Sequence, residues 1–112
     1  MGERENPSGL VQGTLDMLIL RTLNRGALHG YGIAERIRQV SEDVLQVGES
    51  SLYPALQRLL LNGWVNAEWG ASENNRRARY YTLTPEGKKR LASERKEFQR
   101  MVGAIQQVLE SA

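Results

Sequence analysis

The sequence has no cysteine and a single histidine, His29. Without cysteine the chain cannot form disulfides, thiolate nucleophiles or cysteine-based zinc sites. One histidine excludes metal sites built from several imidazoles and leaves a Ser-His-Asp arrangement only one base. A glycine-rich phosphate loop is also missing. We therefore expect neither an enzyme nor a bound metal or cofactor.

Long apolar runs are missing too. The longest, Met17 to Leu20, is far below the roughly 18 to 20 residues that cross a bilayer. The first residues, MGERENPSG, lack the apolar region of a signal peptide. With 40% hydrophobic and 25% charged residues, the 112 residues have the composition of one globular domain with its own core. We expect a cytoplasmic protein that does not associate with membranes.

The positive charge is unevenly distributed, although the formal net charge is only +2. Residues 1–70 contain six Lys or Arg and eight Asp or Glu, whereas residues 71–112 contain nine and five. Six of those nine cations fall within residues 76–90, which contain one acid, Glu86. This stretch is the part of the chain that we expect to meet a polyanion.

Helical periodicity dominates the first half of the chain. Residues 1–9 show no periodicity and are expected to form a mobile arm. Apolar residues recur at helical spacing over 14–25 and 30–41, separated by a short glycine-containing link that makes the two helices pack directly. A third helix is predicted over about 50–62, with Ser50 or Ser51 accepting its first free N–H groups and with Gly63 ending it.

The third helix divides into two faces at 100° per residue. Its apolar face consists of Leu52, Ala55, Leu56, Leu59 and Leu60. The opposite face carries Ser50, Pro54, Gln57 and Leu61, flanked by Tyr53 and Arg58. One face is therefore expected in the core and the other is available to a partner.

The second half of the chain predicts a hairpin and a long helix. Segments 64–69 and 79–83 are rich in aromatic and β-branched residues, and the polar segment between them forms a long cationic tip. A helix from Thr84 or Pro85 to about Glu110 follows, too long for a core of this size to cover. Its apolar stripe, expected to form a dimer interface, consists of Leu91, Phe98, Met101, Val102, Ile105, Val108 and Leu109.

This order of elements is that of a winged helix-turn-helix, a mainly α fold with a small β-hairpin, followed by a dimerisation helix. We expect the winged domain over 10–83 and the dimerisation helix over 84–112. A helix supported from behind fits the DNA major groove, and a cationic hairpin reaches phosphates or the adjacent groove. The expected DNA-binding residues are Tyr31, Ser50, Ser51, Tyr53, Pro54, Gln57, Arg58, Arg76, Arg77 and Arg79.

Five segments together resemble the PadR family of transcriptional regulators. They are LVQGTLDMLIL from Leu10, HGYGI from His29, SLYPALQRL from Ser51, NG at 62–63 and RYYTLTPEGKKRL from Arg79. The resemblance covers about residues 10–110 and is to the compact branch with one helix after the wing. It implies a homodimeric bacterial repressor that binds an inverted-repeat operator in double-stranded DNA. It also implies relief of repression by a small aromatic or drug-like effector.

The resemblance bears on the effector site as well. Compact members commonly have Trp near position 98, where its ring can stack on a flat ligand, and this chain has Phe98. Phe98 and Met101 are therefore the candidate ligand-binding residues, in addition to their expected place in the dimer interface. The alternative function is a winged-helix module that binds another protein and not DNA.

Other residues are expected to have structural roles. His29 should fix the start of the second helix by a local hydrogen bond, and Asp16 should form an intramolecular salt bridge or cap. Trp64 and Trp69 should pack in the hairpin and core. Tyr80 and Tyr81 alternate on a strand, so that one should be buried and the other should face outward.

Overall fold

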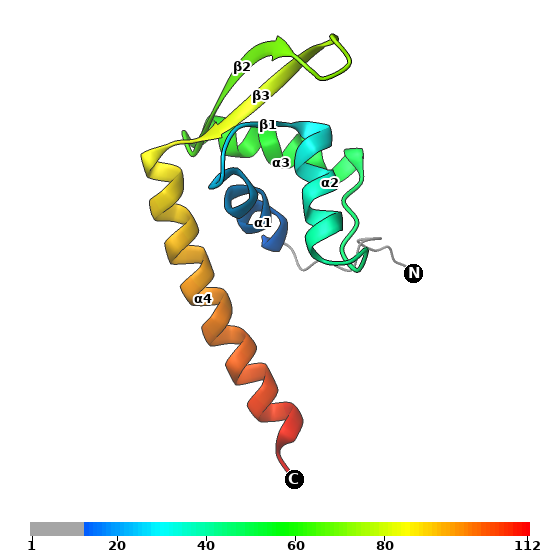
Figure 1. The fold of residues 1–112 in the computed structure, drawn as a ribbon. Coiled ribbons are helices and arrows are strands. Elements are labelled where there is room, and N and C mark those ends of the chain that lie inside the picture. Colours follow the sequence, from blue (N-terminus) through cyan, green and yellow to red (C-terminus); the bar gives the residue numbers. More distant parts are fainter. Residues whose placement is uncertain (1–12) are drawn as a thin grey trace.

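The computed structural model describes residues 13–112 (Figure 1). The mobile arm expected over 1–9 lies outside the described residues. Four helices and three strands follow one another in the order α1 (Thr14–Leu23), β1 (Leu28–His29), α2 (Gly30–Val40), α3 (Glu49–Leu61), β2 (Val65–Ala71), β3 (Arg77–Leu83) and α4 (Pro85–Glu110). The architecture is the expected one, mainly helical with a small hairpin and a long last helix.

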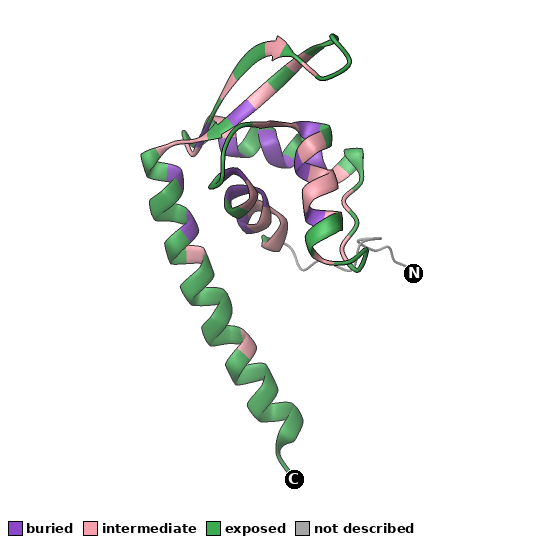
Figure 2. Cartoon of the chain, in the orientation of Figure 1, coloured by how far each residue is buried: buried purple, intermediate pink, exposed green. Residues whose placement is uncertain are grey.

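The core lies where α1, α2 and α3 meet the base of the hairpin. The predicted apolar face of α3 is buried there: Leu52, Ala55, Leu56 and Leu59 are all at most 2% exposed. Figure 2 shows buried segments concentrated on these helices and absent from the outer half of α4. Burying these side chains is the main stabilising contribution, and it holds α3 from behind with its other face free.

The strands form one antiparallel sheet in the order β1-β3-β2. The hairpin strands are longer than expected, because the ladder continues to the pair Ala71 and Arg77. The tip therefore shortens to residues 72–76, and Asn75 adopts the left-handed conformation there, with φ of 58°. Strand β1 has two residues and pairs with β3 at Tyr80 and Tyr81. Sequence periodicity did not indicate it.

Helix α3 starts one residue earlier than predicted. Its N-cap is Gly48, and no side chain caps the helix, so neither Ser50 nor Ser51 has the expected capping role. Both serines lie inside the first turn. The end is as predicted: Gly63 has φ of 74°, and hydrogen bonds from Gly63 N–H to the Leu60 carbonyl and from Trp64 N–H to the Leu59 carbonyl complete a Schellman motif.

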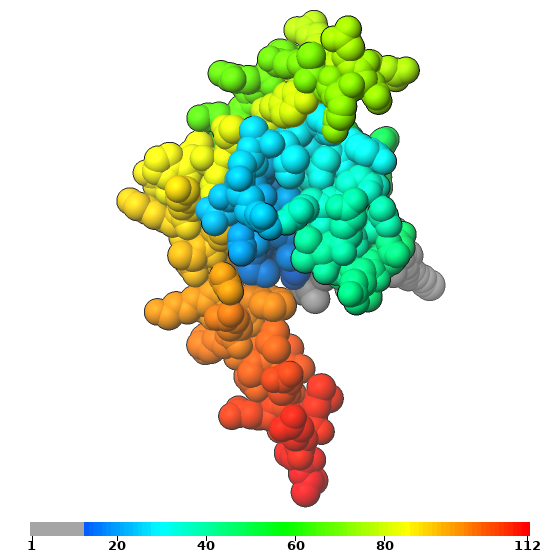
Figure 3. Space-filling model, viewed as in Figure 1, coloured from blue at the N-terminus to red at the C-terminus, as the bar shows by residue number. Residues whose placement is uncertain are grey.

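Helix α4 begins at a side-chain cap and then leaves the core. The Thr84 hydroxyl accepts a hydrogen bond from Gly87 N–H at 2.9 Å, and Pro85 occupies the first helical position. Leu91, 8% exposed, belongs to the core of its own chain. This corrects its expected place in a dimer interface, because its side chain has little surface left for a partner. Beyond this turn α4 projects away from the helical domain (Figures 1 and 3).

Among residues 13–112, no helix is both long and apolar enough to cross a membrane.

Candidate nucleic-acid interface

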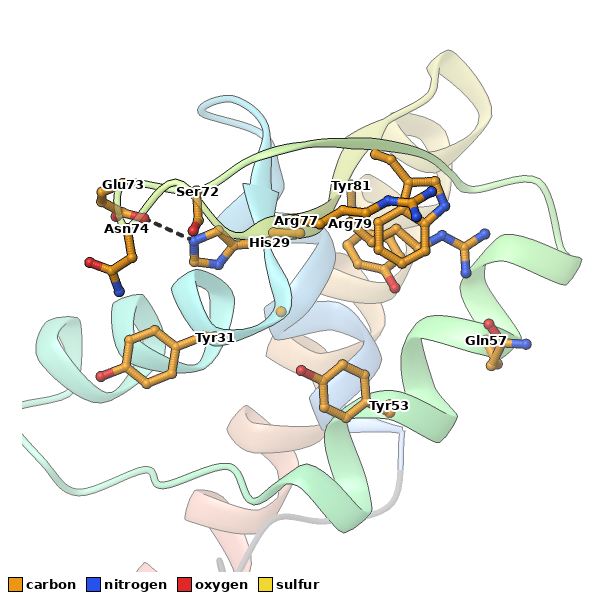
Figure 4. A pocket seen from close by; sticks show the side chains of 13 residues that line it. His29, Tyr31, Tyr53, Gln57, Ser72, Glu73, Asn74, Arg77, Arg79 and Tyr81 are labelled. Atoms are coloured by element: carbon orange, nitrogen blue, oxygen red, sulfur yellow. Dashed lines mark hydrogen bonds and ion pairs between the residues drawn. The ribbon is translucent and has the colours of Figure 1, made fainter.

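A hollow of about 740 Å³ lies between the exposed face of α3, the start of α2 and the hairpin β2–β3, hereafter the wing (Figure 4). Its aromatic lining residues come from all three elements, and both described arginines of its lining come from β3. The described residues that line it are His29, Gly30, Tyr31, Tyr53, Gln57, Trp69, Ser72, Glu73, Asn74, Arg77, Ala78, Arg79 and Tyr81.

His29 connects the start of α2 to the tip of the wing. It is the N-cap of α2, and its Nδ1 accepts a hydrogen bond from Gly32 N–H at 3.0 Å, as the sequence predicted. Because Nδ1 accepts, the ring proton lies on Nε2, which is 3.3 Å from Glu73 Oε1 (Figure 4). A backbone hydrogen bond at Glu73, followed by the one from His29, lowers the pKa of this carboxyl. One imidazole thus caps a helix and binds the wing tip.

Tyr53 occupies its place in the hollow because residue 30 is a glycine. A Cβ at Gly30 would lie 2.9 Å from the Tyr53 hydroxyl oxygen, closer than side chains approach one another. The absence of a side chain lets the phenol of α3 lie against the first turn of α2 (Figure 4). Tyr31, the next residue of α2 after Gly30, is exposed. Two phenol rings from two helices therefore border the hollow.

The cations of the wing divide into two groups. Arg76 is exposed at the tip, whereas Arg77 and Arg79 lie on β3. Arg77 was expected on the tip, and the longer strand places it on the ladder instead. Alternate residues of a strand share a face, so Arg77 and Arg79 both point to the face that carries Trp69. Trp69 was expected to pack in the hairpin and core; it lies on the hairpin strand β2, but it is 58% exposed.

Arg58 forms an ion pair within the chain. Its Nη2 lies 2.7 Å from Oδ1 of Asp16, which joins α3 to α1 and gives Asp16 its predicted salt bridge. The guanidinium is about half exposed. In the part of the chain that the structure describes, Arg58 therefore differs from the wing arginines in having a carboxylate partner.

The hollow gathers half of the expected DNA-binding set. Tyr31, Tyr53, Gln57, Arg77 and Arg79 all line it. Ser50 and Pro54 are exposed on α3 outside the lining, Ser51 is half-buried and Arg76 lies beyond the rim. Sequence reasoning missed Trp69, Ser72, Glu73 and Asn74 as lining residues. For Trp69, the signal in the sequence was its place on a predicted hairpin strand that faces a strand containing arginines.

A second, smaller groove of about 220 Å³ lies between α1 and α4. Phe98 and Met101, the two candidate ligand-binding residues, line it together with Met17 of α1. Farther along α4, Ile105, Val108 and Leu109 are more than half exposed. The outer part of the predicted stripe is thus an apolar surface that the other described residues, 13–112, leave exposed.

Three helices that support a recognition face, followed by a β-hairpin wing, define the chain as a winged helix-turn-helix protein. The model of the PadR-like family of transcriptional regulators matches residues 19–93, and the chain belongs to this family. It is a DNA-binding transcriptional regulator by fold and family.

Solved structures of other proteins support this assignment. A transcriptional regulator from Clostridium thermocellum superimposes with a TM-score of 0.79 at 32% identity, over 86% of this chain and 93% of that one. A PadR family regulator from Clostridium difficile gives 0.74 at 30% identity, over 87% and 99%. An uncharacterised protein from Lysinibacillus sphaericus is 31% identical over 81% of this chain and 84% of its own length.

Proposed function

We propose that this protein is a homodimeric repressor that binds an inverted-repeat operator in the cytoplasm. The observation that carries the proposal is the hollow between α3 and the wing, which is lined by Gln57, Arg77 and Arg79 together with two tyrosines. With α3 in the major groove, one DNA strand would pass through this hollow, and the wing would lie over the next groove.

Each side of the hollow has its own task in this arrangement. Gln57 is exposed in the middle of α3 and has an amide that suits hydrogen bonding to an adenine edge. Arg76, Arg77 and Arg79 would neutralise phosphates. The hydroxyls of the tyrosines and serines would donate hydrogen bonds to phosphate oxygens. Pro54 adds shape to the surface of α3. Arg58 pairs with Asp16 through Nη2 and is about half exposed, so its remaining donors would contact a phosphate beside α3.

Dimerisation is proposed from the apolar surface of α4. Exposed Phe98, Met101, Ile105, Val108 and Leu109, with half-buried Val102, form a stripe along one helix. Leaving so much apolar side chain in water is unfavourable, and a second copy of α4 would cover it. Two-fold symmetry then gives two recognition helices and half-sites about one or two helical turns apart.

An effector would act at the groove between α1 and α4. Phe98 and Met101 line it, and an aromatic or lipophilic ligand would contact both. A ligand that changes the angle between the two α4 helices changes the distance between the two α3 helices. The operator fixes that distance, so the two binding events oppose each other.

The direct test is fluorescence anisotropy with a duplex from the region upstream of the protein's own gene, titrated at several salt concentrations. We expect specific, salt-sensitive binding. The double variant Arg76→Ala/Arg77→Ala should lower the slope of log K against log salt by about 3.6, because the dimer loses four phosphate contacts and roughly 0.9 counterion is released per contact. Arg95→Ala, which removes an exposed cation of α4, is the matched control.

Two outcomes would contradict the proposal. Absence of binding even at low salt would favour a winged-helix module that binds protein. A monomer at micromolar concentration in analytical ultracentrifugation would remove the dimer.

A further inference from the structure

Trp69 is a large apolar side chain that stays exposed in the middle of a cationic surface. It lies on β2 directly opposite Arg79 of β3, and Arg77 is its diagonal neighbour on the same face. The Cζ atom of Arg77 lies 4.4 Å from the centroid of the Trp69 ring, and that of Arg79 lies 6.0 Å away. Both guanidinium groups are within the range of cation–π attraction.

A stacked guanidinium keeps its hydrogen-bonding capacity. Stacking occupies the flat face of the group, whereas its five N–H donors lie in the plane and point outward at the edge. Among residues 13–112, no carboxylate lies within ion-pair distance of Arg77 or Arg79. Both arginines line the hollow (Figure 4), and within the described residues no carboxylate engages their donors.

A second stack of an arginine on a tryptophan differs from this one in that its arginine also has a carboxylate partner. Arg90 lies 4.6 Å over the ring of Trp64, but its guanidinium also pairs with Glu94 one turn along α4. Trp64 is partly buried against the core and outside the hollow. The donors of Arg90 are thus engaged by a carboxylate, whereas within residues 13–112 no carboxylate engages those of Arg77 and Arg79.

We propose that Trp69 is a positioning residue for the DNA backbone. It holds Arg77 and Arg79 in the orientation in which their donor edges meet the phosphates of the strand that passes through the hollow. The entropy of ordering two long side chains is thereby lost during folding and not during binding. The proposal rests on the proposed function, since it requires that DNA enters the hollow.

The first experiment compares Trp69→Leu with Trp69→Phe in the anisotropy assay. We expect Trp69→Leu to weaken DNA binding about fivefold, which corresponds to a loss of roughly 1 kcal/mol of cation–π attraction. Trp69→Phe keeps an aromatic face and should recover most of the affinity. Val40→Ala, which truncates an exposed side chain of α2, controls for a general effect of removing apolar surface.

The second experiment repeats Trp69→Leu in the background Arg77→Gln/Arg79→Gln. If Trp69 acts through the two arginines, its substitution has no further effect in that background. An equal loss in both backgrounds would overturn the positioning role, as would wild-type affinity of Trp69→Leu in the first experiment. Thermal unfolding of each variant checks that the fold is retained, which we expect because Trp69 is an exposed side chain.

A readout without DNA separates this proposal from the proposed function. The chain has two tryptophans, so Trp64→Phe leaves Trp69 as the single indole fluorophore. In that background Arg77→Gln/Arg79→Gln should change the intensity and wavelength of Trp69 emission, because the stacked cations are gone. An unchanged spectrum would contradict the stack itself. An altered spectrum in a protein that does not bind DNA would contradict only the DNA-binding role.

Discussion

Gly87, in the first turn of α4, is the position where one added methyl group should do the most damage. A Cβ there would lie 2.1 Å from the carbonyl oxygen of Trp64 and 2.7 Å from Cδ1 of Leu83. The Trp64 carbonyl cannot easily move, because it accepts the hydrogen bond from Thr84 N–H at 3.1 Å. Helix α4 therefore approaches the start of β2 so closely that only glycine fits.

The cost of Gly87→Ala follows from this contact. Restoring an ordinary separation requires the carbonyl or the helix to shift by about 1 Å, which is overpacking at the upper end of the usual range, about 2 to 3 kcal/mol. For a domain of this size that corresponds to a melting temperature lower by roughly 10 °C. The shift would also displace α4, on which the proposed dimer depends.

Gly103→Ala provides the matched control in the same helix. A Cβ at Gly103 meets no atom within 4 Å, so the substitution adds no contact and removes the conformational freedom of glycine. We expect it to stabilise the protein by about 0.5 to 1 kcal/mol. Urea denaturation of both variants at one fixed protein concentration measures the two effects, since stability of a dimer depends on concentration. Equal stability of Gly87→Ala and the wild type would refute the packing argument.

Three further predictions concern single side chains. Burial raises the pKa of the Tyr81 hydroxyl above 10.0, so one tyrosine should ionise late in an absorbance titration, and Tyr81→Phe should abolish that step. The free energy of unfolding should fall as pH rises above 10.0, because Tyr81 ionises first in the unfolded state. Glu73 is the one acid among residues 13–112 that lines the hollow, so Glu73→Gln should tighten DNA binding severalfold. Glu68→Gln, on the opposite face of the wing, should leave the affinity unchanged, and equal effects of the two substitutions would contradict this. Ile105→Asp should dissociate the proposed dimer in sedimentation, whereas Gln106→Asp should leave it intact.

Sequence periodicity predicts the elements of this fold well where each side chain interacts within its own helix. The buried face of α3 and the start of α4 at Thr84 follow from helical spacing and capping residues alone. Strand β1 could not be found in this way, since two residues carry no period and it exists only because β3 lies beside it. The same holds for Leu91, whose burial depends on where α1 and α4 meet.

The sequence predicted many residues of the candidate site, but not how their side chains are arranged or which contacts they make. The partner of Arg58 is Asp16, 42 positions away, and no local pattern shows that α1 takes up this cation. The exposure of Trp69 likewise depends on how far the ladder of β2 and β3 extends beyond the core. Side chains whose role is set by a second element are the ones that the sequence misplaces.

The relative position of α3 and the wing is fixed within one chain by contacts at the start of α2. His29 caps α2, pairs with β3 through β1 and binds Glu73 of the tip. Tyr53 lies directly against Gly30. A ligand that altered this geometry would have to break several of these contacts at once. The outer turns of α4 have no such constraint, because their apolar side chains are exposed. A regulator of DNA affinity would therefore change the arrangement of the two α4 helices more easily than the position of the wing. Cross-links that fix α4 against α4 should then abolish any effect of a ligand on DNA binding, whereas cross-links between α2 and the wing should preserve it.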